Sequence, residues 1–72
     1  NLVSLDVRPT LDSGKDPFDI IMKTVKVLKD NETLKIINTF EPIPLIRKLK
    51  SKGYESWTDR PEEGIVLTFF KK

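Results

Sequence analysis

The sequence predicts an α/β (α+β) two-layer sandwich in which two helices cover one face of a mixed four-stranded sheet. Three observations lead to this fold class. Short runs with apolar residues at alternate positions are interleaved with two amphipathic helical stretches, and two strand-like runs joined by a Pro-Glu-Glu-Gly segment close the chain. A helix between two strands favours a right-handed crossover to a parallel neighbour, so the expected order is β-α-β-α-β-β.

The first strand is expected over residues 2–7. Val3, Leu5 and Val7 alternate with polar residues there, which is the pattern of a strand buried on one face. Residues 8–15 contain a proline, a glycine and several turn formers, and they are expected to form a loop.

The first helix is expected to begin at Asp16 and Pro17 and to run to about Leu28. The Asp side chain can accept from a free amide of the first turn, and Pro suits the first helical position. One apolar stripe recurs at steps of three and four, so this face should meet the sheet. It comprises Phe18, Ile21, Met22, Val25 and Leu28.

A second strand is expected over residues 33–38, parallel to the first and rich in apolar and β-branched residues. A second helix then follows Glu41 and Pro42. Pro44 falls at its third position, where the missing amide hydrogen costs no helical bond, and Gly53 is expected to end it. Its buried stripe comprises Pro42, Leu45, Ile46 and Leu49.

The last two strands are expected over residues 54–59 and 65–70, as an antiparallel hairpin around a loop at 60–64. Residues 65–70 carry apolar side chains on both faces, which places this strand inside the sheet. The shorter and more polar run at 54–59 is expected at an edge.

Composition limits the function classes. The 72 residues make a single domain, and a strand beginning at Leu2 is what a domain cut from a longer polypeptide would show. A net charge of +2 gives no reason to expect nucleic acid as a partner, and the short apolar runs give none to expect a membrane. With neither Cys nor His, thiol chemistry and the usual zinc ligands are absent, so we expect no metal and no cofactor. The N-terminal residues lack the pattern of a signal peptide, so a cytoplasmic location is expected.

With this order assembled, the chain resembles a TusA-like (SirA-like) domain over nearly its whole length, and most closely a cysteine-free branch carried as a prokaryotic domain of unknown function. The resemblance rests on four segments: Leu5-Asp6-Val7-Arg8, Asp16-Pro17-Phe18, Phe40-Glu41-Pro42-Ile43-Pro44-Leu45 and Lys52-Gly53-Tyr54. It implies the same two-layer sandwich and a link to sulfur or redox pathways.

The sulfur carriers of that superfamily open their first helix with Cys-Pro-x-Pro, whose thiolate carries a persulfide. In this chain Pro17 matches the second proline, Lys15 replaces the first and Gly14 replaces the cysteine. The resemblance therefore does not extend to sulfur carriage by this chain, and a sulfurtransferase role would need a thiol from another chain.

The starts of both helices form one candidate ligand or partner site, because first-turn amides and the dipole favour an anion there. The candidate residues lie at the helix starts and the preceding loops: Asp6, Arg8, Lys15, Asp16, Pro17, Phe18, Glu41, Pro42 and Pro44. The favoured alternative is that Asp16 and Glu41 cap the two helices and leave nothing free. For Asp6 and Arg8, local hydrogen bonds that fix the loop are favoured over lining a pocket.

Two charged groups are interpreted as solvated surface. Adjacent Glu62 and Glu63, opposite Asp59, point apart at a hairpin tip and give no acid/base pair. The basic run over residues 47–52 suits the end of its helix and solubility.

A candidate interface lies on the sheet face that the helices leave open. Trp57, Val66 and Phe70 are expected there as an exposed aromatic and apolar patch. The alternative, that Trp57 simply packs over the sheet, stays open. We therefore expect a non-catalytic module that binds a protein partner or a neighbouring domain. The alternative is a site for a small anionic ligand or redox cofactor at the helix starts.

Overall fold

A computed structural model describes residues 1–72, and its elements follow the predicted order with one addition. The strands are β1 (Leu2–Asp6), β2 (Thr33–Asn38), β3 (Glu55–Glu62) and β4 (Ile65–Lys71). The helices are α1 (Arg8–Asp12), α2 (Phe18–Lys26) and α3 (Ile43–Ser51). None of these helices is long and apolar enough to cross a membrane.

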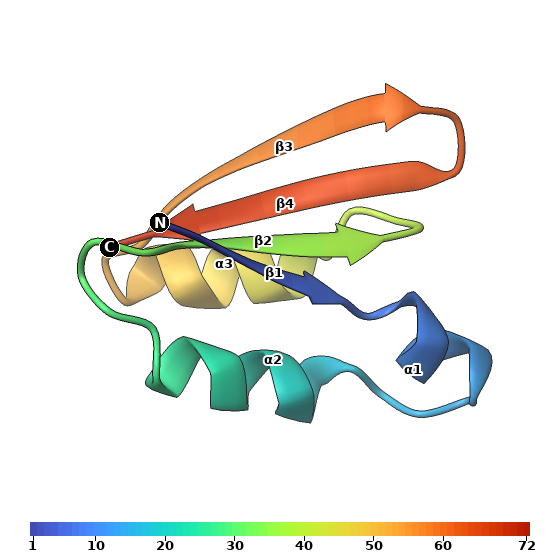
Figure 1. The fold of residues 1–72 in the computed structure, drawn as a ribbon, viewed down its shortest axis with the longest axis horizontal. Helices are drawn as coiled ribbons and strands as arrows, with labels where there is room; N and C mark the ends of the chain where they lie inside the picture. The colour runs from blue at the N-terminus through green and yellow to red at the C-terminus, as the bar shows by residue number, and fades with distance from the viewer.

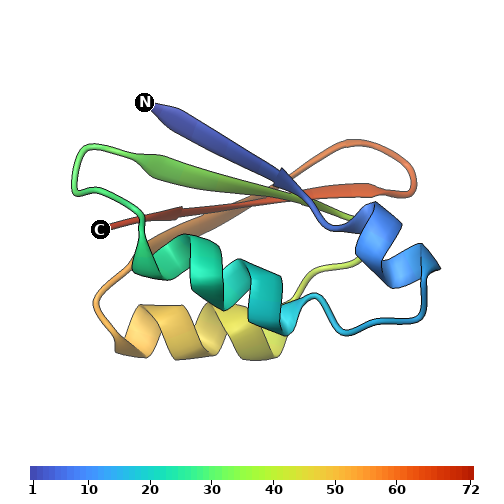
Figure 2. The same ribbon diagram turned by 60° about the horizontal axis from the view of Figure 1, so that its bottom comes forward.

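The sheet has the order β1-β2-β4-β3, with β1 and β2 parallel and the other two pairs antiparallel. The predicted mixed four-stranded sheet is confirmed, with β4 inside it and β3 at an edge. Figures 1 and 2 show α2 and α3 side by side under one face of this sheet, with their first turns at the end where β1 and β2 finish. The opposite face carries no helix.

The core lies between the sheet and the two long helices, and the predicted stripes supply it. Ile21, Val25 and Leu28 are buried from the first stripe, and Leu45 and Leu49 from the second. The sheet contributes the remaining buried core residues, which are Val7, Leu34, Ile36 and Phe70.

The segment predicted as a loop at 8–15 contains the short helix α1. Pro9 is its second residue, where no helical partner exists for an amide hydrogen, so the proline does not prevent the turn. Gly14, at a φ of +80°, then reverses the chain before α2. Figure 2 shows α1 at the end of the sheet, beyond the last residues of β1.

Several predicted boundaries were wrong by one to a few residues. Helix α2 ends at Lys26 rather than Leu28, and α3 begins at Ile43, so Pro44 is its second residue rather than its third. Strand β3 continues to Glu62 through an irregularity in its pairing with β4 after Asp59, which leaves a shorter turn than the predicted 60–64 loop. Gly53 adopts a φ of +96° just after α3, as predicted for a helix end.

Candidate functional site

A pocket of about 270 Å³ lies between the first turns of α2 and α3. The structure brings together five of the predicted helix-start residues in its wall: Asp16, Pro17, Phe18, Pro42 and Pro44. Four further lining residues were not predicted as site residues: Ile21, Asn38, Phe40 and Leu45. The lining is therefore mostly apolar, with Asp16 and Asn38 as its polar side chains.

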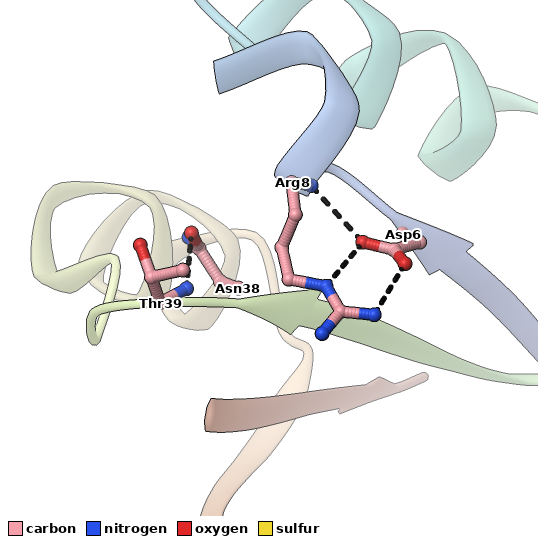
Figure 3. Close-up of polar contacts among 4 residues, drawn as sticks. All are labelled: Asp6, Arg8, Asn38 and Thr39. Atoms are coloured by element: carbon pink, nitrogen blue, oxygen red, sulfur yellow. Dashed lines mark hydrogen bonds and ion pairs between the residues drawn. The ribbon is translucent and has the colours of Figure 1, made fainter. Parts of the chain in front are cut away.

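Asn38, the last residue of β2, is the least expected member of this wall. Only 1% of it is exposed, yet it borders the pocket. Its Oδ1 accepts the Thr39 N–H at 2.8 Å, as Figure 3 shows, which fixes the orientation of the side-chain amide. Asparagine is common in turns that follow strands, so the sequence gives no sign that Asn38 borders a pocket.

The predicted capping hydrogen bond forms at one helix only, and Asp16 makes it from one residue before the N-cap position, which Pro17 occupies. Asp16 Oδ1 accepts the Phe18 N–H at 2.9 Å, which satisfies an amide of the first turn of α2. Glu41 does not cap α3; its carboxylate instead pairs with Arg60 of β3. The interpretation of Glu41 as a cap was wrong, because its carboxylate forms an ion pair with Arg60 of the distant strand β3 instead of accepting from an amide of α3.

The remaining predicted helix-start residues lie away from the pocket. Asp6 and Arg8 bind each other at the end of β1: Arg8 N donates to Asp6 Oδ1 at 3.0 Å and Arg8 Nη2 to Oδ2 at 2.7 Å (Figure 3). The guanidinium hydrogen bonds, followed by the one from the Arg8 N–H, hold the pKa of Asp6 below its ordinary value. The Asp6 carboxylate and the Arg8 guanidinium therefore bind each other, as predicted for local hydrogen bonds that fix the turn after β1. Lys15 borders a separate surface depression with Asp19 and Lys23.

The first turn of α3 is a poor anion site. Pro42 and Pro44 carry no amide hydrogen, and the Ile43 N–H donates to the Glu41 carbonyl at 3.0 Å. Only the Leu45 N–H there has no acceptor in the protein. The first turns of α2 and α3 thus meet at an apolar pocket with few free donors.

The open sheet face differs from the predicted patch in its residues. Phe70 is fully buried and Val66 nearly so, because both point toward the helices; placing them on the open face was wrong. Trp57 is 45% exposed on the open face and stacks on Phe69, with ring centroids 5.3 Å apart and planes within 7°. Phe69, not Phe70, is therefore the aromatic residue of β4 on this face.

Strand register defines the rest of the open face. Leu67 pairs with Ile37 of β2, and Phe69 pairs with both Lys35 and Trp57, so these side chains are neighbours on one surface. Ile65 lies on the same side of β4 as Leu67 and Phe69, so it extends this surface along the strand. We call the five apolar residues of β2, β3 and β4 on this surface the open-face patch: Ile37, Trp57, Ile65, Leu67 and Phe69.

No His, Cys, Asp or Glu residues cluster in threes in a way that could hold a metal ion. A family model described as an uncharacterized conserved protein (DUF2249) matches residues 4–72. No curated protein and no solved structure matches the chain.

Proposed function

Since the chain belongs to the uncharacterized family DUF2249, we propose its function from its own surfaces: it is a non-catalytic module that binds a protein partner through the open-face patch. The observation that carries the proposal is the stacked Trp57–Phe69 pair on a sheet face that no helix covers. Contiguous apolar side chains on an open face mark interaction surfaces, and tryptophan is enriched among the residues that dominate binding energy.

The partner's chemistry follows from Lys35, which lies in the middle of this face. Its neighbours on the adjoining strands are Ser4 and Phe69, and it makes no ion pair. The carboxylate of Asp6, next to Ile37 in the register, is already paired with Arg8, and that of Asp59 lies on the far side of β4, next to Leu67. An apolar protein surface that carries a carboxylate opposite Lys35 therefore complements the open-face patch.

The first experiment is photo-crosslinking with p-benzoylphenylalanine placed at position 57 of the full-length protein in the cells that produce it. We expect one discrete protein adduct. The matched control is the same group at Val27, which is 75% exposed just after α2. Adducts that are absent, or identical at the two positions, would contradict the proposal, and an adduct with a second copy of this chain would replace the partner by self-association.

The second experiment tests the charge pairing with the purified partner. Lys35→Glu is expected to weaken binding by about tenfold or more, because it faces one carboxylate with another. Changing the facing carboxylate of the partner to Lys should restore affinity for the Lys35→Glu variant. Unchanged affinity in Lys35→Glu would remove Lys35 from the interface.

Three finer predictions belong to the same proposal. From the helix start at Asp16-Pro17-Phe18 we propose a distant relation to the TusA-like superfamily, and through it a place in a sulfur- or redox-related pathway. Sulfur carriage by this chain is not part of the proposal, because Gly14 occupies the position of the carrier cysteine. The cytoplasmic location also stays a prediction.

A further inference from the structure

We propose that the pocket between α2 and α3 binds a small uncharged group that combines an apolar body with a carbonyl oxygen, such as an acylated amide. This site is separate from the open-face patch, since it lies on the helix side of the sheet. Three features of the pocket support this inference: an unpartnered amide in its wall, the kind of donors it offers, and a lining that contains a carboxylate but no Lys or Arg.

The side-chain amide of Asn38 supplies the first feature. Its Oδ1 is held by the Thr39 N–H, so Nδ2 points elsewhere, and no acceptor in the protein receives its hydrogens. Thr68 Oγ1 is the one side-chain polar atom that is both unpartnered and fully enclosed, so Nδ2 retains access to the pocket that Asn38 borders. A buried amide donor without a partner is costly unless water or a ligand accepts from it.

The Leu45 N–H is a second free donor at the same place. It belongs to the first turn of α3, and Leu45 borders the pocket. First-turn amides point out of the beginning of a helix, which is the side on which Pro42 and Pro44 also border the pocket. Both free groups are donors, so the complementary ligand atom is an acceptor oxygen.

The remaining lining residues decide the ligand's charge and size. No Lys or Arg is among the lining residues, and Lys48 Nζ lies 5.0 Å from the centroid of the Phe18 ring, against that ring. The Asp16 carboxylate does line the pocket, which disfavours an anion. The walls are apolar rings and prolines, chiefly Phe18, Phe40 and Pro42. A volume of about 270 Å³ is below the range of about 300–1,000 Å³ typical of sites for drug-sized molecules, so the fitting group is small.

A titration of the ¹⁵N-labelled full chain with N-acetyl-leucinamide tests this site. We expect saturable shifts of the Asn38 Nδ2 hydrogens and of the Leu45 N–H. N-acetyl-leucine carries the same apolar body with a carboxylate, and it should bind about tenfold more weakly or not at all. Shifts that never saturate, or stronger binding of N-acetyl-leucine or of inorganic phosphate, would overturn the proposal.

Two exposed side chains of the same segment provide a matched pair of variants. Phe40 is 50% exposed and lines the pocket, while Ile43 is 49% exposed and does not. Phe40→Ala should weaken N-acetyl-leucinamide binding by about fivefold to tenfold through lost apolar contact, and Ile43→Ala should leave it unchanged. Equal effects of the two substitutions would contradict the assigned pocket.

The open-face variants separate this inference from the proposed function. Trp57→Ser removes the stacked ring on the opposite face and should leave N-acetyl-leucinamide affinity unchanged. Loss of that affinity in Trp57→Ser would contradict two separate sites. Failure of partner binding with intact probe binding would overturn only the proposed function.

Discussion

Similar residues have different roles on the two faces of the sheet, and the neighbours Phe69 and Phe70 show the difference. Phe70 is fully buried beneath the helices, where it belongs to the core. Phe69 points the other way and stacks on Trp57, which is 45% exposed. Residues next to each other in a strand thus divide between holding the fold together and presenting a surface, because side chains alternate across the pleat.

The polar residues of the two faces also differ in their surroundings. On the helix-covered face, Thr68 is fully buried and its hydroxyl has no hydrogen-bond partner. On the open face, Lys35 is half-buried between Ser4 and Phe69 and makes no ion pair. An unpartnered polar group costs stability inside the core, whereas on the open face it can select a partner.

The largest expected effect contrasts the two phenylalanines. Phe70→Ala should lower the free energy of unfolding by about 3–5 kcal/mol, because it leaves a cavity in the core. Phe69→Ala should lower it by no more than about 1.5 kcal/mol, since it loses a half-exposed stack. Urea unfolding followed by circular dichroism measures both values, and equal losses would remove the distinction between the faces.

A smaller effect of opposite sign is expected at Thr68. Thr68→Val replaces the unpartnered hydroxyl by a methyl group of similar shape, so it should raise the free energy of unfolding by about 1 kcal/mol. The same urea experiment measures it. The adjacent β3 residue Thr58, which pairs with Thr68, provides the control substitution Thr58→Val. A loss of stability in Thr68→Val would mean that its hydroxyl has a partner after all.

On the open face, Trp57→Ser should change the free energy of unfolding by less than about 1 kcal/mol while it abolishes binding to the partner. The reason is that a ring exposed to this extent contributes little to the core. Differential scanning calorimetry, read together with the binding assay, separates the two effects. A variant that unfolds would show that Trp57 supports the fold instead.

The smallest expected effect concerns the Asp6–Arg8 pair at the end of β1. The lowered pKa of Asp6 means that its contribution to stability is present above the ordinary Asp pKa and is lost as pH falls through its own lower pKa. Acid unfolding should therefore be shallower below about pH 4 in Asp6→Asn than in the unaltered chain. Identical acid profiles would show that the pair does not stabilise the folded state.

The sequence predicted much of this architecture because periodicity reports burial. The bounds of β2 were confirmed, because a stretch rich in apolar and β-branched residues follows a polar turn there. Both helical stripes were confirmed, because apolar residues recur in them at steps of three and four. The orientation of β4 could not be derived. Its apolar residues occupy both faces and its one polar interior residue, Thr68, points into the core, so period two gave no signal for choosing Phe69 over Phe70.

The candidate sites were predictable only in part, for a different reason. Helix-start residues such as Pro17 and Pro42 were found because local sequence rules mark the beginnings of helices. Asn38 was missed because its role depends on two helices meeting over the end of β2, which is a tertiary arrangement. The pairing of Glu41 with Arg60, 19 residues away in sequence, was missed for the same reason.

The most direct test of the binding face uses the single tryptophan of the chain. With 5-fluorotryptophan incorporated, ¹⁹F NMR gives one resonance, from position 57, and the partner recovered by crosslinking can be added unlabelled. We predict that the resonance shifts and loses its sensitivity to solvent isotope as the partner covers the open-face patch. A resonance that stays unchanged while the partner binds would contradict the account.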